Sequence, residues 1–356
     1  MHIIFRFLRK DLLPAIIIWV FAFQLFTILM FLSCEGTEKF THPSERLLYD
    51  FLRGAILGFL YSLNNLFNQR FIRFADYRLR VVFMTLSQLF IFALAVVIIS
   101  LLFDGAGILY FIINDPESLM EYSKLVFGFV IYFFVVIVLL IIGKEVKEIF
   151  GPGILFKILM GKYYKPREED RYFLFIDLKS STALTNKLGI MSYTRMLQEC
   201  FKISSKIVDK FQGEIYQYVG DEVIFTWPRK KGLNNLNCYK AFPFFKKELE
   251  KHRSYFESEF NLMPEFKSSL DVGKVVVAEV GQIKKEISYI GDPLNVGSRL
   301  IGACNQFGTD FLMTKPAAEE LKERSAIEVN DKGSMPVKGK DEEVRLFSMN
   351  TDNFLI

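Results

Sequence analysis

Two aspartates in the C-terminal half have the residue type and the setting for phosphate chemistry. Asp177 ends a short apolar run, Tyr172 to Ile176, and Asp221 follows 44 positions later, beside a glycine and between two apolar-rich runs. Two carboxylates at one sheet edge would form an oxygen-rich site suited to Mg²⁺ or Mn²⁺ together with substrate phosphates. Aspartate is also common in turns because its side chain accepts hydrogen bonds from backbone amides. The spacing alone leaves both roles open.

The periodicity around these aspartates predicts the elements that position them. A buried strand over Tyr172–Ile176 precedes a helix that ends before Gly213, and Gly220-Asp221 is a hairpin signal between two strands. The remaining expected elements are a helix over 235–251, strands over 266–272 and 274–280, and a helix that opens at Asp292. This order is that of an α+β, ferredoxin-like βαββαβ sheet with helices on one face. Such a sheet places the end of its first strand beside the central hairpin.

Four ordered segments resemble the motifs of the class III adenylate/guanylate cyclase catalytic domain, in particular of a membrane-anchored bacterial-type adenylate cyclase. They are FLFIDLKSST, YQYVGDEVIFTW, YIGDPLNVGSRL and VKGK, and the resemblance covers about Tyr172 to Met349. By position, Asp177 and Asp221 match the family's two metal-binding aspartates. The resemblance implies two Mg²⁺ or Mn²⁺ ions per site, which assist attack of the ribose 3′-oxygen on the α-phosphorus and departure of pyrophosphate.

The same resemblance implies roles for three more side chains. Asn295 and Arg299 lie four residues apart, so a helix presents them on one face. They match the asparagine that orients the ribose and the arginine that stabilises charge developing on the phosphate. Lys338, the first lysine of VKGK, matches the lysine that contacts the triphosphate.

The residues that open a helix after Asp177 carry hydroxyl groups. The backbone there suits phosphate binding by amide donors, and we interpret the side chains themselves as helix N-caps. These residues are Ser180, Ser181 and Thr182.

The base-selecting positions depart from the family's commonest pattern. Adenylate cyclases of this family often carry Lys and Asp there, and this chain has Gln217 and Ser288. Glutamine offers a donor and an acceptor, and serine offers either one, so the pair suits the N1 and N6 edge of adenine. It differs from the Glu and Cys associated with guanylate cyclases. ATP is therefore the expected substrate, with a guanylate cyclase as the alternative.

The family divides each active site between two catalytic domains. This chain holds a full set of site residues and one catalytic domain, so the resemblance implies a homodimer with two equivalent sites. A shift of the membrane helices of two chains would then separate the halves of each site and lower turnover.

The N-terminal part predicts a four-span transmembrane bundle. Leu12–Leu32, Val81–Phe103 and Leu125–Gly143 carry no charge and are long enough to cross a bilayer, and Leu48–Phe67 is a fourth span with Asp50 and Arg53 near one end. Counted along the chain, Leu48–Phe67 is the second span. Basic residues cluster before Leu12, after Phe67 and after Gly143, which predicts cytoplasmic termini. We expect a multi-pass protein of the cell inner (plasma) membrane.

Composition fits this division. The chain is 51% hydrophobic, and its 44 basic and 40 acidic residues are too balanced to indicate a nucleic-acid partner. Four cysteines without a CxxC pair indicate neither a zinc module nor a disulfide framework. We expect a membrane domain over 1–145, a connector over 146–170 interrupted by Gly151-Pro152-Gly153, and a cytosolic cyclase domain over 171–356.

Two further interpretations remain. The soluble half could be a catalytically silent nucleotide-binding module, or the membrane half could be a receptor with the cyclase as its output. Polar residues within the spans would either line a ligand cavity or form hydrogen bonds between helices. These residues are Gln24, Gln88, Asn64 and Asn65.

Overall fold

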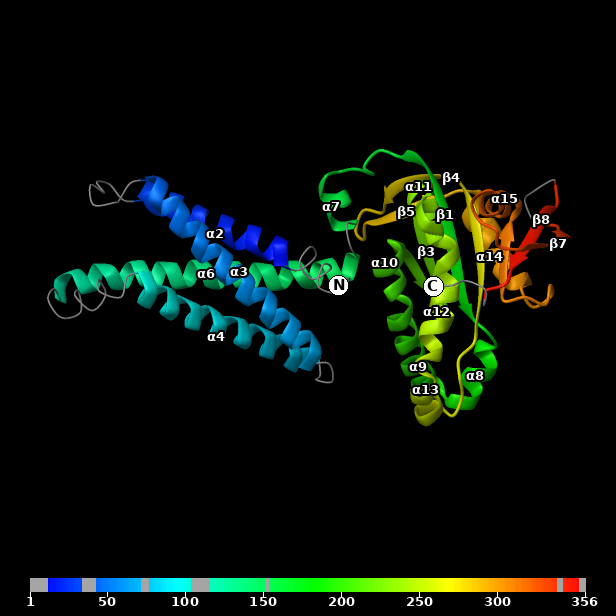
Figure 1. The fold of residues 1–356 in the computed structure, drawn as a ribbon, viewed down its shortest axis with the longest axis horizontal. Coiled ribbons are helices and arrows are strands. Elements are labelled where there is room, and N and C mark those ends of the chain that lie inside the picture. Colours follow the sequence, from blue (N-terminus) through cyan, green and yellow to red (C-terminus); the bar gives the residue numbers. More distant parts are fainter. Residues whose placement is uncertain are drawn as a thin grey trace. The chain divides into compact units, whose positions relative to one another are not determined.

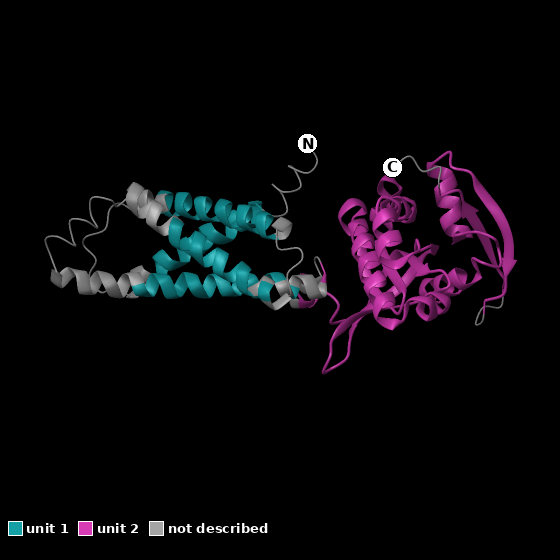
Figure 2. Ribbon diagram, turned by 90° about the horizontal axis from the view of Figure 1, so that it is seen from below, with its two compact units in different colours: residues 1–149 teal, residues 150–356 magenta. Residues whose placement is uncertain are grey.

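The structure is a computed structural model that describes residues 12–33, 43–71, 77–103, 116–151, 154–337 and 342–351. The chain divides into two compact units, Met1–Ile149 and Phe150–Ile356, which Figure 2 colours separately. The predicted connector over 146–170 overlaps the end of the last helix of the first unit and the start of the first strand of the second.

The first unit is helical. Its described helices are α2 (Leu13–Ser33), α3 (Pro43–Phe71), α4 (Tyr77–Phe103) and α6 (Pro116–Phe150). Helices α2 and α3 approach closely because α3 carries glycine at two positions four residues apart. A Cβ at Gly54 would lie 2.5 Å from Val20 Cα, and one at Gly58 would lie 2.6 Å from Ile16 Cα. Small residues at this spacing are typical of close helix contacts in membranes.

Aromatic side chains fill the interior of this unit, while apolar side chains also cover its exterior. The rings of Trp19 and Phe133 are buried and stack at 5.9 Å between centroids. Phe90 and Phe127 are 69% and 67% exposed. Among the described residues, one window, Phe127–Lys144, is long and apolar enough to cross a membrane, and Leu13–Leu29 and Val82–Leu94 are shorter apolar stretches.

The second unit contains a twisted sheet with helices on both faces (Figure 1). Its strands are β1 (Arg167–Leu178), β2 (Glu214–Val219), β3 (Glu222–Pro228), β4 (Phe266–Val280), β5 (Glu286–Ile290), β6 (Phe311–Thr314), β7 (Val329–Met335) and β8 (Val344–Met349). Its α-helices are α7 (Ile154–Leu159), α8 (Ser181–Leu188), α9 (Ile190–Ser204), α10 (Lys206–Phe211), α11 (Arg229–Leu233), α12 (Asn237–Glu250), α13 (Arg253–Phe260), α14 (Asp292–Ala303) and α15 (Lys315–Arg324). Among the described strands the order is β2-β3-β1-β4-β6-β8-β7, and β5 pairs with β4.

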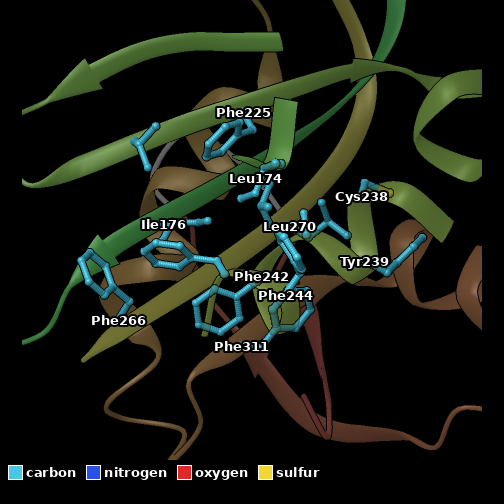
Figure 3. Packing of buried hydrophobic residues seen from close by; sticks show 14 of the residues in the cluster. Leu174, Ile176, Phe225, Cys238, Tyr239, Phe242, Phe244, Phe266, Leu270 and Phe311 are labelled. Atoms are coloured by element: carbon cyan, nitrogen blue, oxygen red, sulfur yellow. The ribbon is translucent and has the colours of Figure 1, made fainter. Parts of the chain in front are cut away.

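Strand β1 is central and alternates between two apolar cores. Leu174 and Ile176 face the larger core, which lies against helices α9, α10, α12 and α15 and appears in Figure 3. Phe173 and Phe175 face the opposite way, toward Ile301 of α14. We call this second side of the sheet the α14 face. The apolar run Tyr172–Ile176 within β1 is expected where both sides of a strand are buried.

The predicted order of strand, helix, hairpin, helix and strand is confirmed, with one boundary wrong. The prediction of helices on one face of the sheet is also wrong, because α14 packs on the face opposite to α9, α10, α12 and α15. The strands expected over 266–272 and 274–280 are one continuous strand, β4, which runs through Gly273. Gly273 pairs with Arg171 of β1, and a Cβ added at Gly273 would lie 2.9 Å from Pro293 Cγ. The glycine therefore permits the close approach of α14 and does not mark a turn.

Candidate active site

Asp177 lies in a row of charged residues across three strands. In the antiparallel register it is opposite Glu222 of β3 on one side and Lys267 of β4 on the other. Residues paired in this way carry their side chains on the same side of a sheet. Asp177 follows Phe175 by two positions, so the whole row lies on the α14 face, at the end of β1.

Asp221 is brought to this row by the β2–β3 hairpin. Val219 pairs with Glu222, which leaves Gly220 and Asp221 as a two-residue loop. Gly220 has φ 62°, a left-handed conformation that favours glycine. The Asp221 charge is near enough to raise the pKa of Asp177. Asp221 directly precedes Glu222, which pairs with Asp177, so the two predicted aspartates lie close together.

The carboxylates at this edge repel one another electrostatically. Burial and the Asp221 charge raise the pKa of Asp177, although Lys267, whose Nζ lies 3.2 Å from Asp177 Oδ2, partly offsets the rise. Burial and the charges of Asp177 and Asp221 raise the pKa of Glu222 to about 7. The site thus carries more negative charge than Lys267 neutralises, which favours a cation.

This donor set fits a divalent ion that is shared with a substrate. The described residues contain no group of three His, Cys, Asp or Glu side chains arranged to hold a metal by themselves. Magnesium is commonly bound through one or two carboxylates and the phosphates of its substrate, and not by an all-protein cage. Asp177 and Asp221 match that arrangement.

Ser180, the first hydroxyl residue after Asp177, does not act as expected. Ser180 precedes α8 in a left-handed conformation, with φ 57°, and its side chain makes no capping hydrogen bond. Inside α8, Ser181 provides a backbone carbonyl that accepts a hydrogen bond from Thr185 Oγ1 at 2.8 Å. The interpretation of Ser180 as a side-chain N-cap is wrong, because a left-handed residue does not have the extended conformation of an N-cap.

Asn295 and Arg299 lie on α14, and Gly297 fixes that helix on the sheet. A Cβ at Gly297 would lie 2.2 Å from the Phe175 ring, and Ser269 Oγ of β4 donates to the Gly297 carbonyl at 2.7 Å. Residues two before and two after Gly297 project from the other side of a helix. Asn295 is accordingly exposed and Arg299 only partly buried.

Gln217 and Ser288 come from strands β2 and β5, which are not neighbours in the sheet. A bulge between Ile215 and Gln217 alters the register of β2, and Gln217 is exposed. The residues beside the pair are in contact, since the rings of Tyr216 and Tyr289 meet edge to face at 4.9 Å between centroids. This contact brings the two strand segments together.

Lys338 lies outside the described residues. Val337 before it is buried, and the described chain resumes at Glu342. Its role stays a prediction from the resemblance, as do the roles of the other site residues.

The candidate site contains two further charged residues, Glu222 and Lys267, that the sequence did not predict. Glu222 directly follows Asp221, and its alternation with the buried Val223 could have indicated that it faces the site. Lys267 had no such signal, because only the register between β1 and β4 places it opposite Asp177.

Comparison with known proteins agrees with this arrangement. Residues 163–350 match the adenylate and guanylate cyclase catalytic domain. "Adenylate cyclase 2" of Rhizobium meliloti (strain 1021) is 29% identical over 205 residues, which are 58% of this chain and 56% of that protein. "Adenylate cyclase" of Anabaena cylindrica is 27% identical over 185 residues, which are 49% of this chain and 36% of that protein. The chain thus matches little more than half of the first relative's length, and less of the second's.

A solved structure has the same fold. A bacterial light-regulated adenylyl cyclase superimposes with a TM-score of 0.52 and 18% identity, covering 63% of this chain and 66% of that one. At this identity the likeness concerns the fold alone. The family match takes in more than half of the sequence, and the chain therefore belongs to the family of adenylate and guanylate cyclase catalytic domains.

Proposed function

We propose that the protein is a membrane-anchored adenylate cyclase, which converts ATP to 3′,5′-cyclic AMP and pyrophosphate in a homodimer. The observation that carries the proposal is that the β2–β3 hairpin places Asp221 beside Asp177 at the end of β1, with Asp177 on the α14 face. Family membership and relatives named adenylate cyclases support the reaction and the substrate.

Each side chain has a distinct task in this reaction. Asp177 and Asp221 would hold Mg²⁺ or Mn²⁺, which when bound lowers the pKa of the ribose 3′-hydroxyl and neutralises triphosphate charge. Asn295 orients the ribose through its amide. Arg299 places a guanidinium against the phosphate, where it stabilises the charge that develops as the bond to pyrophosphate breaks.

The reaction balances without any other reactant. The 3′-oxygen gives up its proton to solvent and forms a bond to the α-phosphorus, while the bond from that phosphorus to the β-phosphate oxygen breaks. Lys338 would contact the triphosphate as a point charge. Gln217 and Ser288 would read the base, and their hydrogen-bonding groups suit adenine.

The homodimer and the membrane anchor are parts of the same proposal. A single catalytic domain per chain supports a shared site between two copies. The apolar exterior of the first unit, the close α2–α3 contact and the window Phe127–Lys144 support a membrane anchor. The four spans in the inner (plasma) membrane and the cytoplasmic termini are proposed from the apolar runs and the placement of basic residues in the sequence. Carbonate-resistant sedimentation and protease access to a C-terminal tag in inverted vesicles test the anchor and its orientation.

The polar residues of the first unit favour an anchor over a ligand cavity. Nδ2 of Asn64 and Nδ2 of Asn68 on α3 donate to Ser87 Oγ on α4, at 3.1 and 3.0 Å. Lys144 Nζ of α6 donates to Asn65 Oδ1 at 3.4 Å. These are hydrogen bonds between helices, as a structural role requires. Ligand binding by the helices would instead support a receptor with a cyclase output.

Product analysis tests the proposed activity. The purified full-length protein is incubated with Mn²⁺ and either ATP or GTP, and the products are identified by mass spectrometry. We expect cyclic AMP to form faster than cyclic GMP, and Asp177→Asn to lower the rate by about 100-fold or more. Glu328→Gln, at an exposed residue, is the matched control and should leave the rate unchanged. Faster GTP turnover would identify a guanylate cyclase, and no product from either nucleotide with Mg²⁺ or Mn²⁺ would identify a silent module.

A further inference from the structure

We propose that Arg171 is a positioning residue that holds together the two strands carrying the base contacts Gln217 and Ser288. It would not touch the nucleotide itself. The inference rests on the proposed function, because that function assigns Gln217 and Ser288 to the base. Arg171 lies six residues before Asp177, so the two are about 20 Å apart along β1.

The guanidinium of Arg171 is buried and held by three hydrogen bonds. The residue is 1% exposed. Its Nη1 donates to Glu169 Oε2 and its Nη2 to Glu214 Oε2, both at 2.7 Å, and its Nε donates to Thr226 Oγ1 at 3.0 Å. Because each guanidinium nitrogen has a partner, the plane of the group is fixed.

That fixed plane packs against an aromatic ring of β5. Arg171 Cζ lies 4.8 Å from the centroid of the Tyr289 ring, a distance at which a cation is attracted to a π face. Tyr289 directly follows Ser288, and its ring also meets Tyr216, which directly precedes Gln217. Arg171 therefore supports the contact that brings the two base-reading segments together.

The hydrogen bonds of Arg171 also reach the start of β2. Glu214 is the first residue of that strand, and Gln217 is the fourth. An apolar residue in place of Arg171 would fill the same volume without the cost of burying charge. It would hold neither Glu214 nor the tyrosine face with a defined geometry. The choice of a buried arginine is thus explained by the need to fix β2 and β5 relative to β1.

The connector over 146–170 forms hydrogen bonds with both carboxylates that bind Arg171, those of Glu214 and Glu169. Lys157 Nζ of α7 donates to Glu214 Oε1 at 2.8 Å, and the Tyr163 hydroxyl donates to Glu169 Oε1 at 2.9 Å. The backbone carbonyl of Tyr163 also accepts from Glu279 N of β4 at 2.9 Å. Movement of the connector would therefore act on the partners of Arg171, and through them on the base contacts.

Steady-state kinetics of the full-length protein test this role. The central variant is Arg171→Met combined with Glu214→Gln, which removes one charge of each sign. Glu169 keeps its ion pair with Lys162, and Lys157 can still donate to the amide oxygen introduced at position 214. We expect the KM for ATP to rise by about tenfold and the ratio of kcat/KM for ATP over GTP to fall toward one. The kcat should change by less than about threefold, because Asp177, Asp221 and Arg299 are untouched. Lys157→Met should shift KM in the same direction by less.

A matched control separates positioning from stability. Arg229 also pairs with two carboxylates of the second unit, those of Asp170 and Glu320, which are not the carboxylates that bind Arg171. Arg229→Met should lower the melting temperature and leave KM and selectivity as in the wild type. If the double variant behaves in the same way, Arg171 is a structural residue only and the inference is wrong.

Two further outcomes are decisive. If the double variant does not fold, Tyr289→Leu takes its place, since it keeps the ion pairs and removes the ring. Unchanged KM and selectivity in that variant would overturn the inference, and a tenfold rise would support it. A wild-type protein that forms no cyclic nucleotide overturns the proposed function, and this inference with it. An active wild type with unaffected variants overturns this inference alone.

Discussion

The ammonium nitrogen of Lys267 lies 3.2 Å from Asp177 Oδ2, between strands β4 and β1. Both side chains are largely buried, at 13% and 21% exposure, so the attraction is weakly screened. Lys267 thus occupies part of the coordination space of the carboxylate that we assign to a divalent ion. Binding of that ion requires the lysine to move or to share the carboxylate.

Lys267→Met should therefore tighten metal binding. Without the competing ammonium, we expect the Mn²⁺ concentration for half-maximal activity at pH 8 to fall by about fivefold. A titration of activity against Mn²⁺ measures it. Lys179→Met is the control, because Lys179 pairs with the exposed Glu265 and not with Asp177. A higher Mn²⁺ requirement in Lys267→Met would show that the lysine assists metal binding.

Gly297→Ala should displace helix α14 and lower activity. The added methyl group would meet the Phe175 ring at 2.2 Å, and overpacking of this kind costs about 1–3 kcal/mol. Since Asn295 and Arg299 lie on the same helix, we expect kcat to fall by about 100-fold, because small misplacements of catalytic groups have large effects. Rate measurements on folded protein, checked by circular dichroism, give the value.

Gly302 provides the comparison within the same helix. A Cβ there has no atom within 4 Å, so Gly302→Ala adds only helix propensity, about 1 kcal/mol at most. Activity should be retained. Equal losses in the two variants would mean that α14 tolerates no substitution, and not that the Phe175 contact positions it.

The order of elements around the candidate site was predictable because it depends on local signals. The Gly220-Asp221 turn, the apolar run before Asp177 and the spacing of Asn295 and Arg299 each mark one element. Strand β4 was predicted wrongly as two strands because Gly273 serves a contact with Pro293, far away in sequence. A glycine that permits close packing looks the same in a sequence as a glycine in a turn.

Residues defined by register were not predictable. Lys267 meets Asp177 only because β4 pairs with β1 at that position, and Arg171 is buried only because Glu214 and Glu169 reach it from β2 and β1. Charged residues are usually solvated, so Arg171 carried no signal of burial. Contacts of this kind depend on strand pairing, which sequence periodicity does not define.

The network around Glu214 should make the protein sensitive to acid. Burial alone would raise the pKa of Glu214, but the charges of Arg171 and Lys157 lower it below its usual value of 4.5. A carboxylate whose pKa is lowered on folding stabilises the native state above its unfolded pKa, and this contribution is lost as pH falls through the folded value. We therefore expect the melting temperature to drop as the pH falls below about 4.5.

Glu214→Gln isolates this contribution. At pH 7 the variant should be less stable by about 2 kcal/mol, because charged hydrogen bonds to Arg171 and Lys157 are weakened. Its melting temperature should then change less than that of the wild type on acidification. Scanning fluorimetry of the detergent-solubilised protein at several pH values measures both effects. If the melting temperatures of the two proteins fall in parallel as the pH is lowered, other groups cause the acid sensitivity.

Mixed dimers test whether one active site is shared between two copies. Asp177→Ala removes a proposed metal ligand and Arg299→Ala removes the proposed phosphate contact, so each variant alone should be inactive. If the metal-binding half and the phosphate-binding half come from different chains, a mixed dimer keeps one intact site and one doubly defective site. Tandem purification retains only the mixed dimers, in which one of the two sites is intact, so we expect about half of the wild-type rate. Co-expression of the two variants with different affinity tags, tandem purification and assay of cyclic AMP measure the recovery.

Asp177→Ala mixed with Asp221→Ala is the control and should recover nothing, since both changes lie in the same half-site. No recovery in the test pair would place the complete site within one chain, and recovery in the control would place Asp177 and Asp221 in different half-sites.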